Sequence, residues 1–325
     1  MTELQHTVTA ETRSRGPILD LLSRSTLLII LLVLAIVAHF LSKGTFLTSR
    51  NIINVLTQYS ILGVLAVGQT LIILTAGIDL SLGSIMALSA VVTLSVQGLG
   101  FLPSLLIGFA VGASAGMLNG LLVAIGRVPP FIATLGMMQV ALGLAYVISR
   151  GFSINDRGGH FAQFKVLGVS SLVWIWALVA LLAWFISRRT RYGSYIYAVG
   201  GNPRTAKISG VPVTRVLVFV YAFAGLCAAI GAVLYIGRFG NAEPTIGRIA
   251  LLSMSMAPVV VGGTSLFGGS GGIGKTIVGV LILGVLNNIM TLIGVPANPQ
   301  QVVQGTIILL VVYMFARQER RKQLR

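Results

Sequence analysis

The stretch RRTRYGSYIYAVGGNPRTAKISGVPVTR, residues 188–215, lies between two long apolar segments, and the rest of the chain is organised around it. It contains six Arg or Lys residues and no acidic residue. In a protein whose apolar segments span a membrane, short loops rich in Lys and Arg lie on the cytoplasmic side. We therefore expect this stretch to face the cytoplasm and to set the orientation of the segments around it.

The centre of this stretch has the pattern of a turn followed by a short helix. Gly200-Gly201-Asn202-Pro203 predicts the turn, because Gly tolerates positive φ and Pro cannot continue a helix. Residues 204–209 are then expected to form a short surface helix that Gly210 and Pro212 end. A turn followed by a short exposed helix is typical of a docking element. The alternative is a solvated loop whose charge only fixes orientation, which composition alone favours.

Composition excludes a water-soluble fold. Hydrophobic residues make up 55% of the chain, charged residues make up 9%, and the mean hydropathy is +0.94. The net charge of +16 would suggest nucleic acid for a soluble protein, but here the basic residues lie in short loops and tails. They indicate orientation and contact with anionic lipid of the membrane, and no nucleic-acid partner is expected. The lone Cys227 excludes an internal disulfide and is expected to pack in the core.

The apolar segments predict an all-α polytopic membrane protein with about ten transmembrane helices. Crossing a bilayer takes roughly 20 residues of helix. The weakest segment is 249–263, which is short and contains Pro258. It is retained because its loss would place the basic tail at residues 317–325 outside. The expected spans are 25–41, 55–74, 82–97, 104–125, 131–149, 169–187, 216–237, 249–263, 277–293 and 302–316.

Both ends of the chain are expected in the cytoplasm. Residues 1–24 are polar and lack a signal-peptide cleavage pattern, so they are interpreted as an N-terminal tail. Residues 317–325 form a basic C-terminal tail. With ten spans, sixteen of the 23 Lys and Arg residues fall inside and seven outside, which is the asymmetry expected of membrane proteins.

Asp79 is the one acid within an otherwise continuous apolar region. One interpretation is a helix cap, in which Asp79 or Ser81 accepts backbone hydrogen bonds at the start of the third helix. The other is a place in a solute path, since ionisable groups at membrane depth usually mark a pathway or a relay. The two interpretations are not exclusive.

A stripe of glycines runs along the fourth expected span. Gly108, Gly112, Gly116 and Gly120 recur at every fourth position, so they share one face of a helix. Small residues in such a stripe predict the close approach of a neighbouring helix.

Several polar side chains lie at membrane depth and are candidates to line a translocation path. Each of them is also a candidate for a hydrogen bond between helices, which is the commoner role. The path candidates are Gln69, Asp79, Asn119, Thr134, Asn287 and Asn288.

Residues 269–276, GSGGIGKT, match the phosphate-binding pattern G-x-x-x-x-G-K-S/T, but this match is not interpreted as a nucleotide site. A phosphate loop follows a buried β-strand and needs a later acid for magnesium or water. The next acid after Glu243 is Glu319, beyond the last expected span. We predict a glycine-built inner connection, with Lys275 on the cytoplasmic side. His160 has no nearby His or Cys, so no metal site is expected.

Five short motifs, in order along the chain, together resemble the membrane subunits of ribose-type (ribose, xylose or galactose) ABC sugar importers. The resemblance covers nearly the whole chain except about the first 25 residues and the outer loops. The motifs are GIDLSLGS at 77–84, PFIATLG at 130–136, YAVGGN at 197–202 with SGV at 209–211, GGTSLFGG at 262–269 and LNN at 286–288.

The resemblance implies an ABC importer permease fold in the bacterial inner membrane, with residues 25–316 as the transmembrane permease domain. Such permeases work as a pair, so a second permease copy, in a homodimer, is expected. Each copy docks on an ABC ATPase subunit, which binds ATP and Mg²⁺, and receives solute from a periplasmic sugar-binding protein. The permease itself is expected to bind no cofactor or metal, to have no catalytic residue and not to be an enzyme.

The resemblance also assigns an ATPase-coupling loop to residues 188–215. Where ribose permeases commonly have Glu-Ala-Ala after the Asn, this chain has Pro203-Arg204-Thr205. The missing carboxylate makes a basic contact to an acidic ATPase surface the expectation. The coupling role passes to Gly200, Gly201, Asn202, Arg204, Thr205, Ala206 and Gly210.

The expected function is import of a ribose-like monosaccharide by alternating access, driven by the ATPase subunit. One alternative is a proton- or sodium-coupled secondary transporter that uses Asp79, although no second ionisable partner at depth is visible. An intramembrane enzyme would need clustered His, Cys or acids, which the sequence lacks. The particular solute, whether ribose, xylose, galactose, a sugar-like signal or a nucleoside, is left open.

Overall fold

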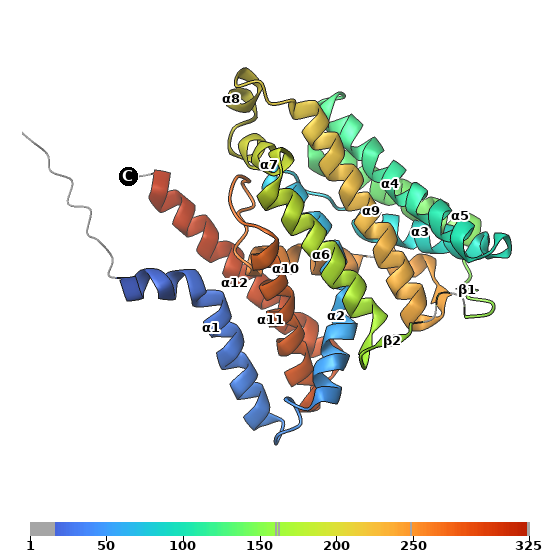
Figure 1. Cartoon of the computed structure of the whole chain (residues 1–325), viewed down its shortest axis with the longest axis horizontal. Helices are drawn as coiled ribbons and strands as arrows, with labels where there is room; N and C mark the ends of the chain where they lie inside the picture. Colours follow the sequence, from blue (N-terminus) through green and yellow to red (C-terminus); the bar gives the residue numbers. More distant parts are fainter. Residues whose placement is uncertain (1–16, 160, 162, 248, 324–325) are drawn as a thin grey trace, which may run out of the picture.

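The computed structural model describes residues 17–159, 161, 163–247 and 249–323, and these residues are helical over most of their length (Figure 1). A helix satisfies its backbone hydrogen bonds within itself, as the interior of a membrane requires. The twelve α-helices of this part are α1 (Pro17–Leu41), α2 (Ser49–Leu74), α3 (Leu82–Ser95), α4 (Phe101–Ala124), α5 (Pro130–Ser149), α6 (Ser171–Arg189), α7 (Arg191–Gly201), α8 (Pro203–Ile208), α9 (Val213–Phe239), α10 (Ile249–Val261), α11 (Ile273–Leu292) and α12 (Ala297–Gln323). The short elements are η1 (Gln97–Leu99), η2 (Pro244–Gly247), β1 (Ile154–Asn155), β2 (Lys165–Val166), β3 (Val169–Ser170) and β4 (Asn241–Ala242).

The prediction of about ten membrane helices is not confirmed, although a helix lies at each expected segment. Among the described residues, six helices are long and apolar enough to cross a membrane: α2, α4, α5, α6, α9 and α11. The apolar part of α1 (Thr26–Leu41) and α3 are shorter. With its 14 residues, α3 is about 21 Å long, less than the ~30 Å of a hydrocarbon core. Helix α10 has 13 residues and contains Pro258.

The predicted tails are partly helical. Helix α1 begins at Pro17, inside the tail predicted for residues 1–24, and residues 1–16 lie outside the described part. Helix α12 continues to Gln323, through most of the tail predicted for residues 317–325. The difference arises because Arg, Lys, Gln and Glu favour helix as much as many apolar residues do. The residue at which hydropathy falls therefore does not mark the end of a helix.

The basic stretch at residues 188–215 is mostly helical rather than a loop. The predicted turn is present between α7 and α8, and the short helix predicted at residues 204–209 corresponds to α8. Helix α7, with 11 residues, was not predicted. It begins after Thr190, whose Oγ1 accepts a hydrogen bond from the N–H of Gly193 at 3.3 Å.

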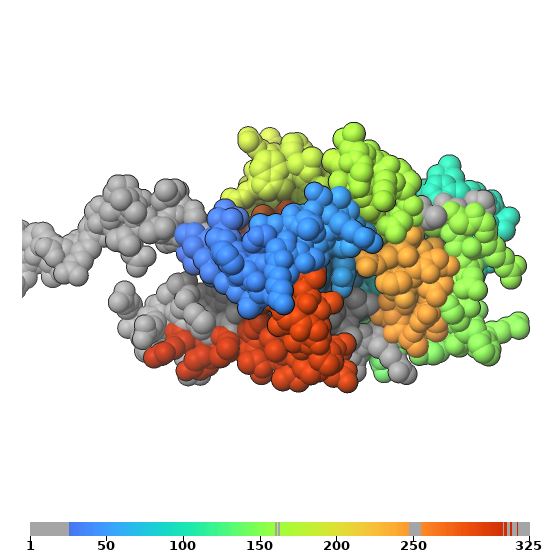
Figure 2. Space-filling view, turned by 90° about the horizontal axis from the view of Figure 1, so that it is seen from below, coloured from blue at the N-terminus to red at the C-terminus, as the bar shows by residue number. Residues whose placement is uncertain are grey.

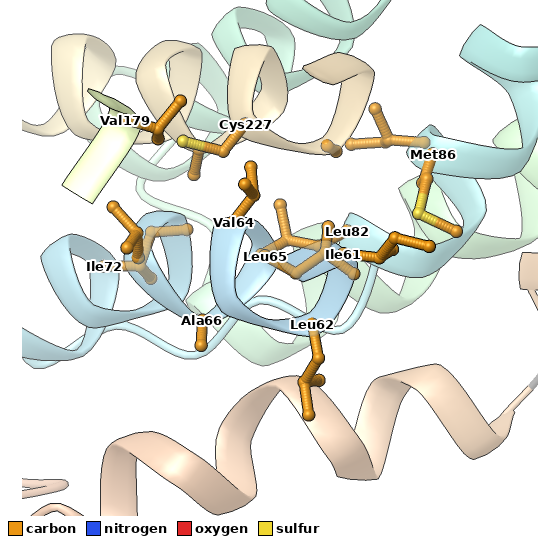
Figure 3. Packing of buried hydrophobic residues seen from close by; sticks show 14 of the residues in the cluster. Ile61, Leu62, Val64, Leu65, Ala66, Ile72, Leu82, Met86, Val179 and Cys227 are labelled. Atoms are coloured by element: carbon orange, nitrogen blue, oxygen red, sulfur yellow. The ribbon is translucent and has the colours of Figure 1, made fainter. Parts of the chain in front are cut away.

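Helices α2 and α3 form the core of the bundle. Every residue of α2 from Tyr59 to Leu74 is buried, and α2 contacts α6, α7, α9, α10 and α11. Figure 3 shows Val64 pointing toward Cys227 of α9, while Leu62 points the opposite way toward another helix. A helix that is apolar on all sides is typical of such a position. Cys227 is buried and free, as predicted.

The glycine stripe of α4 lies against α3 and α9. A Cβ added at Gly112 would lie 2.6 Å from the carbonyl oxygen of Gly225, and one at Gly120 would lie 2.7 Å from the Cα of Val218, both on α9. Gly108 faces Thr93 of α3 in the same way. The predicted close approach of a neighbouring helix is therefore confirmed, and α4 and α9 form one tightly packed pair.

Figure 1 shows α7 and α8 at one end of the bundle and the turn between α1 and α2 at the opposite end. Figures 1 and 2 place α1 and α12 together on one side of the elongated molecule, with α4 and α5 on the other. The strands pair antiparallel, β1 with β4 and β2 with β3, in the connections away from α8. The short strands therefore do not lie at the α8 end.

Candidate coupling element and buried polar groups

Helix α8 is built by local signals around Asn202, its N-cap. The side-chain Oδ1 of Asn202 accepts hydrogen bonds from the N–H groups of Arg204 (3.0 Å) and Thr205 (3.1 Å). Pro203 takes the first helical position, where its missing N–H leaves no bond unmade. Gly210 follows the helix with a φ of 81°, a conformation that favours glycine. The local sequence therefore fixes this short helix.

One side of α8 packs on the bundle and the rest is exposed. Ala206 is 4% exposed and is the one buried residue of α8, whereas Ile208 is 88% exposed. Arg204, Thr205 and Lys207 are exposed around it. Together, α7 and α8, residues 191–208, form what we call the α7–α8 element. It presents an apolar side chain within a basic rim.

The adjacent glycines of the α7–α8 element have opposite surroundings. Gly200 is buried, and a Cβ there would collide with the carbonyl oxygen of Leu74 at the end of α2. The same Cβ would lie 2.6 Å from the backbone nitrogen of Gly269, whose N–H donates to the Leu74 oxygen at 3.0 Å. Gly201 is exposed, with nothing within 4 Å of a Cβ at that position. Gly200 therefore serves packing, and Gly201 borders open surface.

The segment between α10 and α11, residues 262–272, is a glycine-rich turn held by its own hydrogen bonds. The N–H of Ser265 donates to the oxygen of Ser270 (3.0 Å), and the N–H of Gly272 donates to Thr264 Oγ1 (3.3 Å). The preceding element is α10, which is a helix and not the strand that a phosphate loop requires. This structure agrees with the predicted glycine-rich connection between two helices. The side of the membrane that the connection faces stays a prediction.

Tyr197 joins α7 to this turn. Its hydroxyl donates a hydrogen bond to the carbonyl oxygen of Gly271 at 3.1 Å. Burial raises the pKa of the Tyr197 hydroxyl, and the positive charge of Arg188 lowers it by a smaller amount. The hydroxyl therefore keeps its proton at neutral pH and remains a donor.

Asp79 is buried and bonded to the residues that follow it. Its Oδ1 accepts from both the N–H and the Oγ of Ser81, each at 2.6 Å. Asn119 of α4 donates from Nδ2 to Ser81 Oγ at 2.9 Å and lies 3.5 Å from Asp79 Oδ2. These bonds fit the cap interpretation, because Asp79 supplies the acceptor just before α3. The path interpretation stays a prediction.

Two further contacts fix the linker between α2 and α3, residues 75–81. Thr134 of α5 donates to the carbonyl oxygen of Ile78 at 3.3 Å. A Cβ at Gly77 would lie 2.7 Å from the hydroxyl of Tyr221 on α9, and that buried hydroxyl has no hydrogen-bond partner in the structure. The linker is therefore held by α4, α5 and α9 together.

Gln69 is fully buried toward the C-terminal end of α2, and neither its Nε2 nor its Oε1 has a hydrogen-bond partner among the described residues. The neighbouring Thr70 does have one, since its Oγ1 lies 2.7 Å from Thr276 Oγ1 of α11. An unpaired buried amide costs about 1–3 kcal/mol. Gln69 is therefore a path candidate whose polar atoms are free to bind, and so is Asn119, whose Oδ1 is likewise buried without a partner among the described residues.

Asn287 and Asn288 bond to other helices. Asn288 and Asn51 of α2 exchange two hydrogen bonds through their amides, each 2.9 Å. Asn287 donates to the hydroxyl of Tyr59 and accepts from Gln304 of α12. Asn287 and Asn288 thus form hydrogen bonds between helices, which is the alternative role given for path candidates.

The six path candidates thus fall into three places. Asp79, Asn119 and Thr134 meet at the linker, Gln69 lies apart within the core, and Asn287 and Asn288 bond to the opposite half of α2. Asn51 and Tyr59 were not predicted as partners, because 237 and 228 residues separate them from Asn288 and Asn287. His160 lies outside the described residues.

Comparison with known proteins assigns the chain to a family. Residues 51–312 match the family described as branched-chain amino acid transport system / permease component. The ribose import permease protein of Escherichia coli K12 is 40% identical over 301 residues, covering 90% of this chain and 93% of that protein. The ribose import permease protein of Bacillus subtilis 168 is 41% identical, covering 87% and 90%. The fructose import permease protein of Rhizobium meliloti is 38% identical, covering 87% and 83%.

No solved structure matches the chain. Its relatives are permease subunits, which are transport components and not enzymes. The six long apolar helices found among the described residues suit a multi-pass membrane protein. The resemblance stated from the five motifs is confirmed. The chain therefore belongs to the permease family described by the branched-chain amino acid transport system / permease component.

Proposed function

We propose that this chain is the transmembrane permease subunit of an ABC importer that moves a ribose-like monosaccharide into the cytoplasm by alternating access. The observation that carries the proposal is the similarity, over about nine-tenths of the chain, to the ribose import permease protein of Escherichia coli. The family description names branched-chain amino acids, so a sugar substrate is inferred from the similar import permeases and not from the family description.

The proposal places the α8 end of the bundle in the cytoplasm of a bacterium, with the chain in the inner membrane. The basic residues of the α7–α8 element support this side by the positive-inside rule. Ten spans then bring both termini to the cytoplasm, with α3 and α10 as short helices inside the bundle. Burial of α3 on all sides supports this, because a helix that does not meet lipid need not match the bilayer thickness.

The α7–α8 element is proposed to dock on an ABC ATPase subunit, which would hold ATP and Mg²⁺. Its exposed Ile208 suits an apolar hollow on the ATPase, and Arg204 and Lys207 suit an acidic rim. The other proposed partners are a second permease copy and a periplasmic sugar-binding protein, as in the resemblance.

Uptake by proteoliposomes tests the function. The chain is reconstituted with its ATPase subunit and the sugar-binding protein, and radiolabelled ribose uptake is measured with ATP inside the vesicles. We expect uptake only when ATP, the ATPase and the binding protein are all present. Uptake driven by a proton or sodium gradient without the ATPase contradicts the proposal and favours the secondary transporter.

The Asp79→Asn variant separates these two functions further. Asparagine keeps an oxygen that accepts from Ser81 but cannot carry a proton or a negative charge. In an ATP-driven importer this variant keeps most of its uptake, because Asp79 only holds the linker. A secondary transporter that uses Asp79 as its relay loses gradient-driven uptake altogether.

A further inference from the structure

We infer that Gly200 is a positioning residue that transmits movement of the α7–α8 element to the α2–α3 linker, through direct backbone contact with the end of α2. The inference rests on the proposed docking of an ATPase on the α7–α8 element. After docking, movement of the α7–α8 element would pass through Gly200 to the α2–α3 linker.

The first observation is the closeness of three backbones. Gly200, the carbonyl of Leu74 and the N–H of Gly269 meet without room for a Cβ at residue 200. A Cβ at Gly268 would lie 2.7 Å from the Gly200 oxygen and 2.8 Å from the backbone nitrogen of Ala76. We call this meeting point the Gly200 joint. Backbone in van der Waals contact transmits displacement directly, because packed interiors compress very little.

The second observation is what lies on the far side of the joint. Leu74 and Ala76 lead into the linker, which Asp79 and Ser81 tie to Asn119 of α4. The α4–α9 pair behaves as one body because its glycines bring the two backbones together. The linker therefore connects the joint to that pair, so a shift of the α7–α8 element reaches α4 through the linker as well as through α9.

The third observation is that the two adjacent glycines at the joint have different surroundings. Gly201, next in the chain, borders open space, since a Cβ there meets nothing within 4 Å among the described residues. Gly200 alone of the two glycines faces inward. If Gly200 and Gly201 were needed only to form the turn, a Cβ would fit equally well at either position.

The test uses the Gly200→Ala variant in the complete complex with the ATPase and the sugar-binding protein. The matched control is Gly274→Ala on α11, also a helical glycine, where a Cβ meets nothing within 4 Å. Three quantities are measured: affinity for the ATPase, sugar taken up per ATP hydrolysed, and hydrogen exchange of residues 75–81 with and without ATP.

We expect Gly200→Ala to bind the ATPase like the control, since α8 keeps its exposed surface. Uptake per ATP falls by about tenfold, a typical size for coupling between two sites. The ATP-dependent change in exchange at residues 75–81 is lost. An unchanged uptake-per-ATP ratio overturns the inference, and so does a loss confined to ATPase affinity, which would make Gly200 part of the docking surface.

If Gly200→Ala does not insert, Gly268→Ala tests the joint from its other side. Its control is Gly294→Ala, because both glycines have a positive φ, 84° and 81°, but a Cβ at Gly294 meets nothing within 4 Å. Loss of uptake per ATP in Gly268→Ala alone supports the joint, and equal behaviour of the two variants overturns it. Failure of the proposed function is distinguishable, because the unmodified chain would then import sugar without the ATPase.

Discussion

Replacing Ile208 with serine is expected to weaken the attachment of the ATPase more than any other single change on α8. Ile208 is 88% exposed and lies on α8 beside the exposed basic residues Arg204 and Lys207. Full burial of an isoleucine side chain is worth about 1.5–3 kcal/mol. If docking buries it completely, Ile208→Ser raises the Kd by about 10- to 150-fold.

The measurement is the affinity of the ATPase subunit for the permease in nanodiscs, with ATPase activity as a second readout. The control is Leu167→Ser, because Leu167 is also 88% exposed but lies in the turn between β2 and β3, away from α8. We expect the control to bind the ATPase like the unmodified chain. Equal affinities for the two variants would refute the docking role of Ile208 and the burial estimate together.

Three other changes test separate parts of the structure. Gly201→Trp is expected to insert normally and to abolish solute-stimulated ATPase activity, because its Cβ has open space and the bulky ring would lie on the proposed docking surface; retained activity contradicts the docking assignment. Gly116→Val on α4 is expected to lower the thermal stability in detergent by about 1–3 kcal/mol through overpacking against α9, and an unchanged melting temperature would show that the pair can relax. A double-mutant cycle of Asn51→Leu and Asn288→Leu is expected to give a coupling energy of about 0.6–1.7 kcal/mol, and additive losses would mean that the amide pair contributes nothing.

Features set by neighbours in the sequence were predictable. The glycine stripe of α4 follows from a four-residue spacing on a helix, and α8 follows from the Asn202 cap, Pro203 and Gly210. Helix α7 was missed because the run from Arg191 to Gly201 mixes basic, aromatic and glycine residues, so that hydropathy does not distinguish it from a loop. The one local sign of a helix start is Thr190, which caps α7.

Features set by contacts far apart in the sequence were not predictable. The sequence marks Asn288 as polar at depth, but only the fold brings Asn51 against it. Likewise nothing local distinguishes Gly200 from Gly201, since the contact with Leu74 depends on how α7 lies across the end of α2. Hydropathy also does not distinguish a long span from a short buried helix such as α3, which is why the predicted count of about ten spans is not confirmed.

The position of α2 explains why a displacement at the Gly200 joint would reach the linker. Near its first residues α2 is tied to α11 by the amide pair of Asn51 and Asn288 and by the bond between Tyr59 and Asn287. Sliding α2 along its axis would break these part-buried bonds, so α2 resists such a shift. The residues that follow Leu74 are not helical until Leu82. A push on Leu74 is therefore absorbed most readily by the linker at residues 75–81, and Asp79 then conveys it to α4.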